Sequence, residues 1–360
     1  MAFNLTEMQQ IYLRDKMNKV SRSFSLIVPA VEPPLNDYLA IAYLICRVVD
    51  NIEDCKQPFP WQSERFAEFT SLIQNPTTAK HTLSLWERKS WPGLSADEQQ
   101  MMSVIGGIML WQIFAQIPHE IRSTIQNWAL VMARGMEQVC NPNQEAGIFS
   151  SHDGIRMPAH EKGYDIYCYY VAGTVGRMIT EMSISHYAIE SKSAQRLLEN
   201  SEASGRALQK TNIVKDFAKD MVRGVCYLPK DWLKEANYDP LRLEGAPFLW
   251  KKKVLDNVLK EFDDFVNYIM DLPASALGLR KACLMMLLPG YQTLLLAAKN
   301  YQHLFTSTHK IKISRVTMTK CLLSARQMAA NNADILDYNH TISAEFITTL
   351  GSDKMRGALP

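Results

Sequence analysis

The sequence of 360 residues predicts an all-α fold, organised as a single domain over residues 1–360. Apolar residues recur mostly at helical spacing, as in residues 39–49 and in residues 108–136, where Pro118 interrupts the pattern. The alternation typical of strands is scarce, and residues 24–28 form the only short candidate. A hydrophobic fraction of 47% is enough for a substantial core, and a charged fraction of 21% argues against disorder.

Proline and glycine mark where the predicted helices end. No proline occurs between Pro158 and Pro229, which leaves room for two or three long helices in succession. Elsewhere the breakers gather in short clusters, which are typical of loops between helices and not of a long interdomain linker. These clusters lie at residues 32–34, 58–60, 92–93, 141–143 and 240–247.

The longest apolar run, residues 283–298, is interrupted by Pro289, Gly290 and Gln292. It is too short to cross a bilayer, and we interpret it as a kinked, buried helix. Residues 1–10 do not combine a charged start with an apolar stretch, so no signal peptide is visible. We therefore expect no transmembrane anchor.

Charge and cysteine content argue against several other classes of protein. The net charge of +2 gives no reason to expect a nucleic-acid partner. The seven cysteines are scattered singly, their number is odd, and no CxxC pair occurs. A zinc site and a disulfide framework are therefore poor interpretations, and a reducing cytoplasmic location is expected.

Two aspartate pairs with the same spacing are the strongest functional signal. Asp50 and Asp54 form the first pair, and Asp216 and Asp220 form the second about 160 residues later. In a helix, residues four apart lie on one face, roughly 5–6 Å apart between Cβ atoms. Carboxylate oxygens are the ligands that Mg²⁺ prefers, and two such faces together can hold several ions and leave positions open for a diphosphate. This is the chemistry of an enzyme that acts on prenyl diphosphates.

The residues around the first pair extend the same helix face. Tyr43, Arg47, Asp50 and Asp54 follow one another at steps of four, three and four, and Glu53 is a further candidate metal ligand. An arginine beside metal-binding carboxylates is suited to donate two hydrogen bonds to diphosphate oxygens. A solvated surface pair is the alternative. Because residues 38–49 are otherwise apolar, the functional interpretation is favoured.

The second pair lies in a similar stripe. Its members follow one another at steps of three, four, four and three, and they are Gln209, Asn212, Asp216, Asp220 and Arg223. Gly224 is placed to end this helix. The alternative is an ordinary solvent-exposed helix face. An amphipathic helix would show the same pattern, because its opposite face has apolar residues that could be buried: Leu208, Ile213, Val214 and Phe217. The pairing with the first stripe favours a site.

Two further segments carry notable residues. Glu261-Phe262-Asp263-Asp264 is acidic but has no basic or amide companions in a similar arrangement, so we interpret it as a solvated face. Residues 164–176 include Gly173 and Gly176, which allow the backbone to bend or a ligand to approach closely. One face of this segment would present Tyr167, Val171, Thr174 and Val175. Tyr167 would stabilise a carbocation, move a proton or simply pack in the core, and the sequence leaves these roles open.

Taken together, these segments resemble the squalene/phytoene synthase family over roughly residues 15–235. The resemblance rests on four motifs and on a fifth that follows the second aspartate pair. They are Ser21-Arg22-Ser23-Phe24; Tyr43-Leu44-Ile45-Cys46-Arg47 leading into Asp50-Asn51-Ile52-Glu53-Asp54; Tyr167-Cys168-Tyr169-Tyr170-Val171-Ala172-Gly173-Thr174-Val175-Gly176; Leu208-Gln209-Lys210-Thr211-Asn212-Ile213-Val214-Lys215-Asp216; and Arg223-Gly224-Val225-Cys226-Tyr227-Leu228-Pro229. The third and fourth motifs look closer to squalene synthases than to phytoene synthases.

The resemblance implies an isoprenoid synthase fold with a central cavity between two Asp-rich helices. It also implies Mg²⁺-dependent head-to-head condensation of two molecules of farnesyl diphosphate to presqualene diphosphate, followed by reduction with NADPH to squalene. Tyr167 matches the tyrosine proposed for proton loss in this family. The resemblance also assigns a set of substrate-binding residues: Arg22, Ser23, Tyr43, Arg47, Gln209, Asn212, Lys215 and Arg223. Peripheral contact with a membrane would serve the release of a greasy product.

Some positions depart from the family pattern. Lys219 stands where the second motif usually has glutamate, and Val225 replaces an arginine of the following segment. Lys310 and Lys312 resemble a basic segment associated with NADPH, although a solvated basic turn explains the same two residues. No Rossmann-type glycine fingerprint occurs, so NADPH would be held by helices.

Two alternatives to a squalene synthase stay open at this point. One is an enzyme of the same family that omits the reduction and forms dehydrosqualene or, from longer substrates, phytoene. The other is a non-catalytic relative, similar to the assembly factors of respiratory complex I. Because such relatives tend to lose the aspartate motifs, the presence of all four aspartates with Arg47 and Arg223 favours an enzyme.

Overall fold

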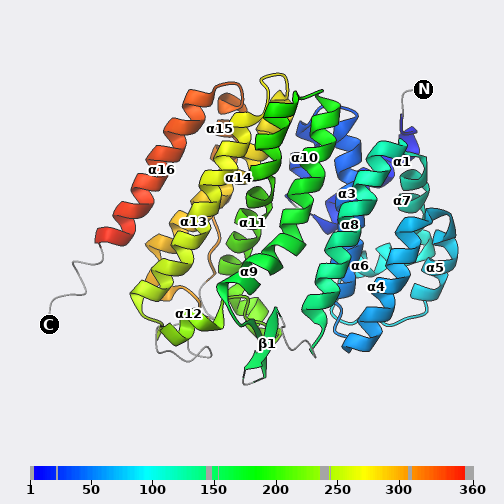
Figure 1. Ribbon diagram of the computed structural model, residues 1–360, viewed down its shortest axis with the longest axis horizontal. Helices are drawn as coiled ribbons and strands as arrows, with labels where there is room; N and C mark the ends of the chain where they lie inside the picture. The colour runs from blue at the N-terminus through cyan, green and yellow to red at the C-terminus, as the bar shows by residue number, and fades with distance from the viewer. Residues whose placement is uncertain are drawn as a thin grey trace. The chain divides into compact units, whose positions relative to one another are not determined.

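A computed structural model describes residues 4–21, 23–142, 148–152, 154–235, 243, 245–306 and 310–352. Helices dominate it, so the predicted all-α class is confirmed (Figure 1). The chain divides into two compact units. The N-terminal unit comprises Met1–Pro142 and Arg177–Ile189, and the C-terminal unit comprises Asn143–Gly176 and Glu190–Pro360. That the whole chain is one domain stays a prediction.

The N-terminal unit is built from helices around α3. Its elements are α1 (Glu7–Val20), α2 (Phe24–Ile27), the 3₁₀ turn η1 (Val28–Ala30), α3 (Leu35–Asp54), α4 (Phe59–Gln74), η2 (Pro76–Thr78), α5 (Ala79–Trp86), α6 (Ala96–Met101), α7 (Val104–Gln116), α8 (His119–Cys140) and most of α10 (Thr174–His186). The break predicted at Pro118 separates α7 from α8.

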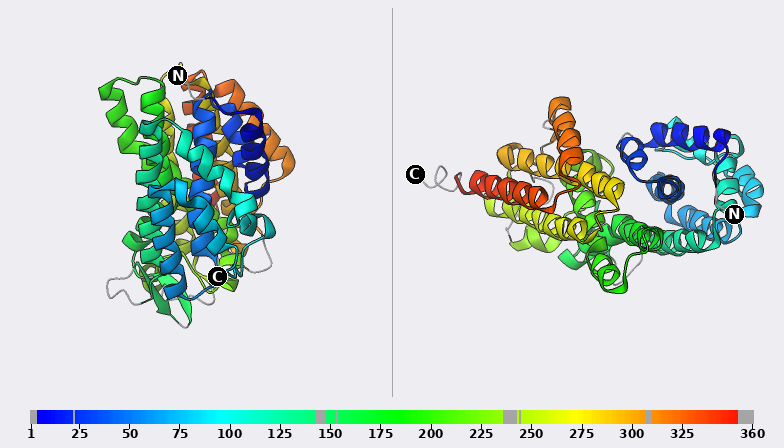
Figure 2. Two further views of the ribbon diagram at one scale, coloured as in Figure 1. Left: turned by 90° about the vertical axis from the view of Figure 1, so that its right-hand side faces the viewer. Right: turned by 90° about the horizontal axis from the view of Figure 1, so that it is seen from above.

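The C-terminal unit places long helices side by side (Figures 1 and 2). Its elements are β1 (Phe149–His152), β2 (Ile155–Pro158), α9 (Glu161–Cys168), the π-helical turn η3 (Tyr169–Gly173), the first residues of α10, α11 (Ser191–Val222), α12 (Lys230–Glu235), α13 (Phe248–Asp271), α14 (Leu277–Lys299), η5 (Tyr301–His303), α15 (Arg315–Met328) and α16 (Asn332–Ser352). The proline-free stretch therefore contains long helices, as predicted.

The short strand candidate at residues 24–28 does not form a strand. The backbone N–H of Phe24 donates to the Ser21 hydroxyl at 3.1 Å, and the chain turns into α2 and then into η1. Five residues are too few for an apolar pattern to distinguish strand from helix, and the local turn decided between them. The antiparallel hairpin of β1 and β2, with Phe149 opposite Pro158, was not predicted because each strand has only four residues.

Helix α14 contains the apolar run, residues 283–298, whose pattern predicts a buried helix. Its length and mean hydropathy of 1.3 would permit a membrane span, but 78% of its most apolar window is buried inside the protein. The helix continues through Pro289. Beside it, the Gly290 backbone lies so close to the Phe262 ring that an added Cβ would come within 2.7 Å of it. This helix is part of the core, as predicted.

A buried network of charges joins α9, α11 and α13. The Lys210 ammonium, on a side chain only 1% exposed, lies 2.7 Å from a carboxylate oxygen of Asp165 and 2.7 Å from one of Glu261. Arg206 donates to both Glu261 oxygens at 3.1 Å. The interpretation of residues 261–264 as a solvated face is therefore wrong for Glu261, because its partners come from α11, more than fifty positions earlier in the chain.

Two glycines bring α11 close to the segment that contains η3. A Cβ on Gly205 would lie 2.0 Å from the Ala172 carbonyl oxygen, and a Cβ on Gly176 would lie 2.1 Å from the Ser201 carbonyl oxygen. Real Cβ atoms do not approach a carbonyl that closely, so the two backbones touch only because both positions are glycine. Gly176 therefore allows two helices to pack closely together.

We expect the charge network to contribute strongly to stability. In Glu261→Ala the buried Lys210 loses its main partner, and the free energy of unfolding should fall by about 3–5 kcal/mol. The double variant Lys210→Met/Glu261→Leu should recover much of this loss, because it removes both buried charges. The surface pair Lys299–Glu345 is the matched control, and Glu345→Ala should cost less than about 1 kcal/mol in a urea unfolding experiment. Equal effects of Glu261→Ala and Glu345→Ala would contradict this account.

The same network predicts a dependence on pH. Burial alone would raise the pKa of Glu261, but Lys210 and Arg206 bring it below its ordinary value of 4.5. A carboxyl with a lowered pKa in the folded state stabilises the fold above its unfolded pKa, and this stabilisation is lost as pH falls through the folded value. The stability difference between the wild type and Glu261→Gln should therefore be constant near neutral pH and shrink below about pH 4.5.

Gly205→Ala should destabilise the C-terminal unit by about 3 kcal/mol, because its Cβ would meet the Ala172 carbonyl and force the backbones apart. Gly351→Ala is the matched control: it also lies in a helix, and its Cβ would meet nothing within 4 Å. This control should leave the melting temperature unchanged or raise it slightly. A Gly205→Ala variant that melts like the wild type would rule out the proposed close contact.

Candidate active site

The first predicted stripe lies along α3. The stripe residues Tyr43, Arg47, Asp50 and Asp54 are partly accessible, and so is Glu53. Nearly all of the remaining residues of this helix are buried. The Arg47 and Asp50 side chains are 21% and 28% exposed. The stripe is therefore a partly buried polar face on a core helix and not a freely solvated surface.

Arg47 is the centre of this stripe. Its Nη1 lies 3.5 Å from an Asp50 carboxylate oxygen, and its Nη2 forms an ion pair with Glu98 of α6. Its Nε is buried and has no hydrogen-bond partner among the described residues. A guanidinium with one unused buried donor beside two carboxylates is suited to accept a further anionic group.

Glu98 is a site residue that the sequence reasoning missed. Its second carboxylate oxygen accepts from the backbone N–H of Ser95 at 2.8 Å, and the Ser95 hydroxyl accepts from the Glu98 N–H, so the two residues form a capping box at the start of α6. The Ser-x-x-Glu spacing was visible in the sequence. This spacing predicts the start of a helix, but it does not indicate that Arg47 would pair with the Glu98 carboxylate.

The charges on this face favour a bound cation. Burial raises the pKa of Asp50 to about 7, and the negative charges of Asp54 and Glu98 add to this rise while Arg47 opposes it. For Glu98, burial acts in the same direction, but the Ser95 N–H and Arg47 bring its pKa below the ordinary value. Carboxylates that repel one another in this way are stabilised by a divalent ion, so the residues of this face fit Mg²⁺.

The segment before α2 supports Tyr43. The Tyr43 and Phe24 rings lie 5.0 Å apart between centroids, and the Tyr43 hydroxyl forms a hydrogen bond with Ser21. Burial raises the pKa of Tyr43 and keeps its hydroxyl protonated. Of the other predicted residues here, Ser23 is exposed and precedes α2, and Arg22 lies outside the described residues.

The second predicted stripe lies along α11. Ile213, Val214 and Phe217 are buried on the other side of the helix, as predicted, whereas Leu208 is partly exposed. The stripe itself is accessible: Asn212 and Arg223 are exposed, while Gln209, Asp216 and Asp220 are partly exposed. The Lys215 ammonium lies 3.0 Å from the Asn212 side-chain oxygen and 3.4 Å from an Asp216 oxygen. An amide, a cation and a carboxylate thus gather within one helical turn.

The predicted helix end at Gly224 is confirmed. Helix α11 stops at Val222, Gly224 adopts a φ of +78°, and the N–H of Val225 donates to the Asp220 carbonyl at 3.1 Å. The chain then pairs with β2: the Arg156 N–H donates to the Gly224 carbonyl at 2.8 Å and the Cys226 N–H donates to the Arg156 carbonyl at 2.8 Å. This clamp fixes the direction in which the next residue, Tyr227, points.

Tyr167 belongs to an aromatic cluster that includes Tyr227. The two rings stack at 4.5 Å between centroids with an interplanar angle of 16°. Phe149 meets both edge-on, at 5.5 Å from Tyr167 and 5.8 Å from Tyr227, and the Arg156 guanidinium lies 5.6 Å from the Phe149 ring. Tyr167 is only 4% exposed, and Tyr227 occupies one face of its ring. Phe149 and Tyr227 thus hold the Tyr167 ring in a fixed position.

The backbone that follows Tyr167 is irregular in a way common at functional sites. Residues 169–173 form a π-helical turn between α9 and α10. A π-turn inserts an extra residue into a helix and changes the direction of the side chains after it. Sequence periodicity could not locate this turn, although the two nearby glycines predicted a bend.

Neither stripe forms a complete metal site by itself. Among the described residues, no group of three or more His, Cys, Asp or Glu side chains gathers closely enough to hold an ion. Each stripe instead offers two aspartates one helical turn apart, and an ion bound there would complete its shell with water and with oxygens of a diphosphate. Asp50, Glu53 and Asp54 would contribute from α3, and Asp216 and Asp220 from α11.

Lys310 and Lys312 precede α15. Both are exposed, while Ile311 between them is 3% exposed and anchors the segment in the core. In the part of the chain that the structure describes, no hydrogen bond or ion pair joins either lysine to another candidate residue. Their assignment to NADPH stays a prediction.

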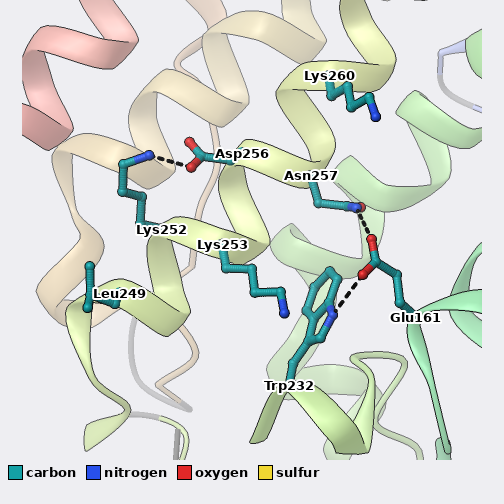
Figure 3. A pocket seen from close by; sticks show the side chains of 8 residues that line it. All are labelled: Glu161, Trp232, Leu249, Lys252, Lys253, Asp256, Asn257 and Lys260. Carbon is teal, nitrogen blue, oxygen red and sulfur yellow. Dashed lines mark hydrogen bonds and ion pairs between the residues drawn. The ribbon is translucent and has the colours of Figure 1, made fainter. Parts of the chain in front are cut away.

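One open hollow of about 340 Å³ lies among α9, α12 and α13 (Figure 3). None of the predicted site residues lines it. Most of its polar groups already have partners: Glu161 accepts from Trp232 and Asn257 at 3.1 Å each, Lys252 pairs with Asp256, and Lys253 pairs with Glu235. This hollow is therefore a poorer candidate for substrate than either stripe.

Known proteins resemble this chain over most of its length. The family model described as squalene/phytoene synthase matches residues 17–317. The squalene synthase of Candida albicans is 24% identical over 221 residues, which are 61% of this chain and 45% of that protein. The chain thus spans less than half the length of that relative.

Solved structures agree with this match. A TcSQS structure with the ligand BPH1237 aligns at a TM-score of 0.72 and 18% identity, covering 96% of this chain and 99% of that one. A dehydrosqualene synthase aligns at a TM-score of 0.60 and 17% identity, covering 89% and 96%. Members of the matched family are prenyltransferases that condense prenyl diphosphates head to head, typically with Mg²⁺. The extent of the family match shows that this chain belongs to the squalene/phytoene synthase family.

Proposed function

We propose that this protein is a squalene synthase. It would condense two molecules of farnesyl diphosphate to presqualene diphosphate with Mg²⁺, and then reduce this product to squalene with NADPH. The observation that carries the proposal is the pair of matching stripes, each with two aspartates one turn apart and an arginine three positions from one of them. This combination suits a substrate that carries a diphosphate.

The stripes supply the groups that the first half-reaction needs. Bound Mg²⁺ would neutralise diphosphate charge and help this group to leave. The partly exposed guanidinium of Arg47 would bind diphosphate oxygens at the α3 stripe, and Lys215 and Arg223 would bind them at the α11 stripe, as a C1–O bond breaks. The allylic cation is then attacked by the double bond of the second substrate, and loss of a proton closes the cyclopropane ring.

Tyr167 is the candidate residue for the proton loss. Its stacking on Tyr227 fixes the ring, and the clamp between β2 and the end of α11 fixes Tyr227 in turn. A hydroxyl held by packing is suited to guide a proton away from a cation, because its position does not depend on the substrate. In the second half-reaction, loss of the remaining diphosphate, rearrangement and hydride addition would give squalene.

A dehydrosqualene synthase is the second candidate function. The observation in its favour is that Lys310 and Lys312 are exposed and make no contact with the other candidate residues among those described. These two lysines are the only residues assigned to NADPH. The reductive half-reaction therefore rests on less support than the condensation.

The first experiment is a product analysis. Purified protein is incubated with farnesyl diphosphate and Mg²⁺, with and without NADPH, and extracts are examined by gas chromatography and mass spectrometry. Squalene formed only with NADPH supports the proposal, and dehydrosqualene formed regardless of NADPH supports the second candidate. Absence of both hydrocarbon and released diphosphate would overturn both and favour a non-catalytic relative.

We expect Asp54→Ala and Asp220→Ala each to lower diphosphate release by about 100-fold or more, because each removes a ligand that balances charge as the diphosphate leaves. Circular dichroism and the melting temperature should change little, since both side chains are partly exposed. Asp334→Ala, in the exposed first turn of α16, is the matched control and should retain full activity. Wild-type rates in either test variant would refute the assignment of the metal faces.

We expect Tyr167→Phe to lower kcat by about 100-fold while KM changes little, because it removes the hydroxyl and keeps the stacked ring. Tyr227→Phe preserves the stacking surface and should retain most of the activity, whereas Tyr227→Ala should lower kcat by releasing the Tyr167 ring. A rise in KM with unchanged kcat in Tyr167→Phe would make this tyrosine a packing residue.

A further inference from the structure

Residues 272–333 carry a strong excess of positive charge. This stretch contains eight Lys and Arg residues and no Asp or Glu. Because the whole chain has a net charge of +2, the remainder has a net charge of −6. Such an asymmetry within one chain is typical of proteins that approach a polyanionic surface.

Most of these cations are available at the surface. Arg280 is an exception: it is 2% exposed and donates to the carbonyls of Ala329 and Ile269. Lys299 pairs with Glu345. Five others are exposed, and none of them pairs with an acidic residue in the described part of the chain: Lys310, Lys312, Arg315, Lys320 and Arg326. The last three lie on α15.

Helix α15 presents apolar and basic side chains on the same outer ridge. Cys321, Ala325 and Met328 form its buried face, and the helix packs on α14 at the edge of the C-terminal unit (Figure 2). On the opposite side Val316 and Leu323 are 66% and 53% exposed. Lys320 falls between them, so the three follow one another at steps of four and three, which is the spacing of one helix face.

We propose that α15 docks on the surface of an anionic lipid bilayer. Val316 and Leu323 would insert at the boundary between headgroups and acyl chains, while Lys320, Arg315 and Arg326 contact lipid phosphates. Basic residues interleaved with exposed aliphatic side chains on one helix are the signature of an interfacial helix, and attraction to anionic lipids adds to the burial of the apolar side chains.

A lipid surface fits this ridge better than a nucleic acid does. Residues 310–333 contain no Phe, Tyr or Trp, whereas surfaces that bind single-stranded nucleic acid combine cations with stacking aromatic rings. A phosphate backbone also gives Val316 and Leu323 nothing apolar to contact. The inference rests on charge and exposure alone and is independent of the proposed reaction, although a hydrocarbon product would enter such a bilayer directly.

The test is co-sedimentation of the full chain with vesicles of phosphatidylcholine alone and of phosphatidylcholine with 30% phosphatidylglycerol, about a third of the lipid being anionic as suits a test of surface charge. We expect binding to the anionic vesicles only, weakening as salt rises. Lys320→Glu/Arg326→Glu should lower the partition coefficient at least about 30-fold, because each reversal replaces attraction by repulsion. Leu323→Ser should lower it about fivefold through lost apolar burial.

Matched controls separate these effects from general ones. Lys80→Glu reverses an exposed lysine on α5, and Ile105→Ser replaces an apolar side chain that is 86% exposed on α7. Both should bind anionic vesicles like the wild type, and Lys320→Arg/Arg326→Lys should also retain binding. Melting temperatures establish that each variant is folded. Equal binding to both vesicle types, unchanged binding of Lys320→Glu/Arg326→Glu, or preference for an oligonucleotide that Leu323→Ser leaves unaffected would each overturn the proposal.

Discussion

The buried contact between Lys210 and Glu261 is the interaction on which the C-terminal unit depends most. It ties α11 to α13, and Asp165 extends it to α9, the helix that also carries Tyr167. Removing an ammonium from water is costly unless carboxylates surround it, so the network holds only when the three helices keep one arrangement. The same helix α11 bears the second aspartate stripe, and the packing that buries Lys210 therefore also orients Asp216 and Asp220 toward accessible surface.

Close backbone packing adds the second constraint. Gly205 lets α11 touch the carbonyl of Ala172 inside the π-helical turn, and a larger residue would separate them. The turn sets the direction of the chain beyond Tyr167, and the pairing of Arg156 with Gly224 and Cys226 sets the position of Tyr227. The stacked tyrosines are thus positioned by backbone contacts that lie outside the aromatic cluster itself, and this rigidity is what a residue that guides a proton requires.

In the N-terminal unit the constraint is different, because polar residues lie along a helix that is otherwise core. A buried carboxylate needs compensation, and Arg47 supplies it for Asp50 on the same helix and for Glu98 on another. The compensation is incomplete, since Asp50 retains a raised pKa and Arg47 retains an unused donor. Side chains whose charges are only partly neutralised by the protein are characteristic of sites that bind an ion or a charged substrate.

The sequence alone determined the helical class, the long helices, the break at Pro118, the helix end at Gly224 and the two aspartate stripes, because helical spacing and breakers act within a few residues of one another. Only the tertiary structure decided that Glu261 is buried, that Glu98 joins Arg47, and that Tyr227 stacks on Tyr167. Each of these contacts joins positions far apart in the chain. Local sequence patterns predict which side chains lie on one face of a helix. Which partners those side chains contact depends on how the whole unit packs, and only the fold determines this packing.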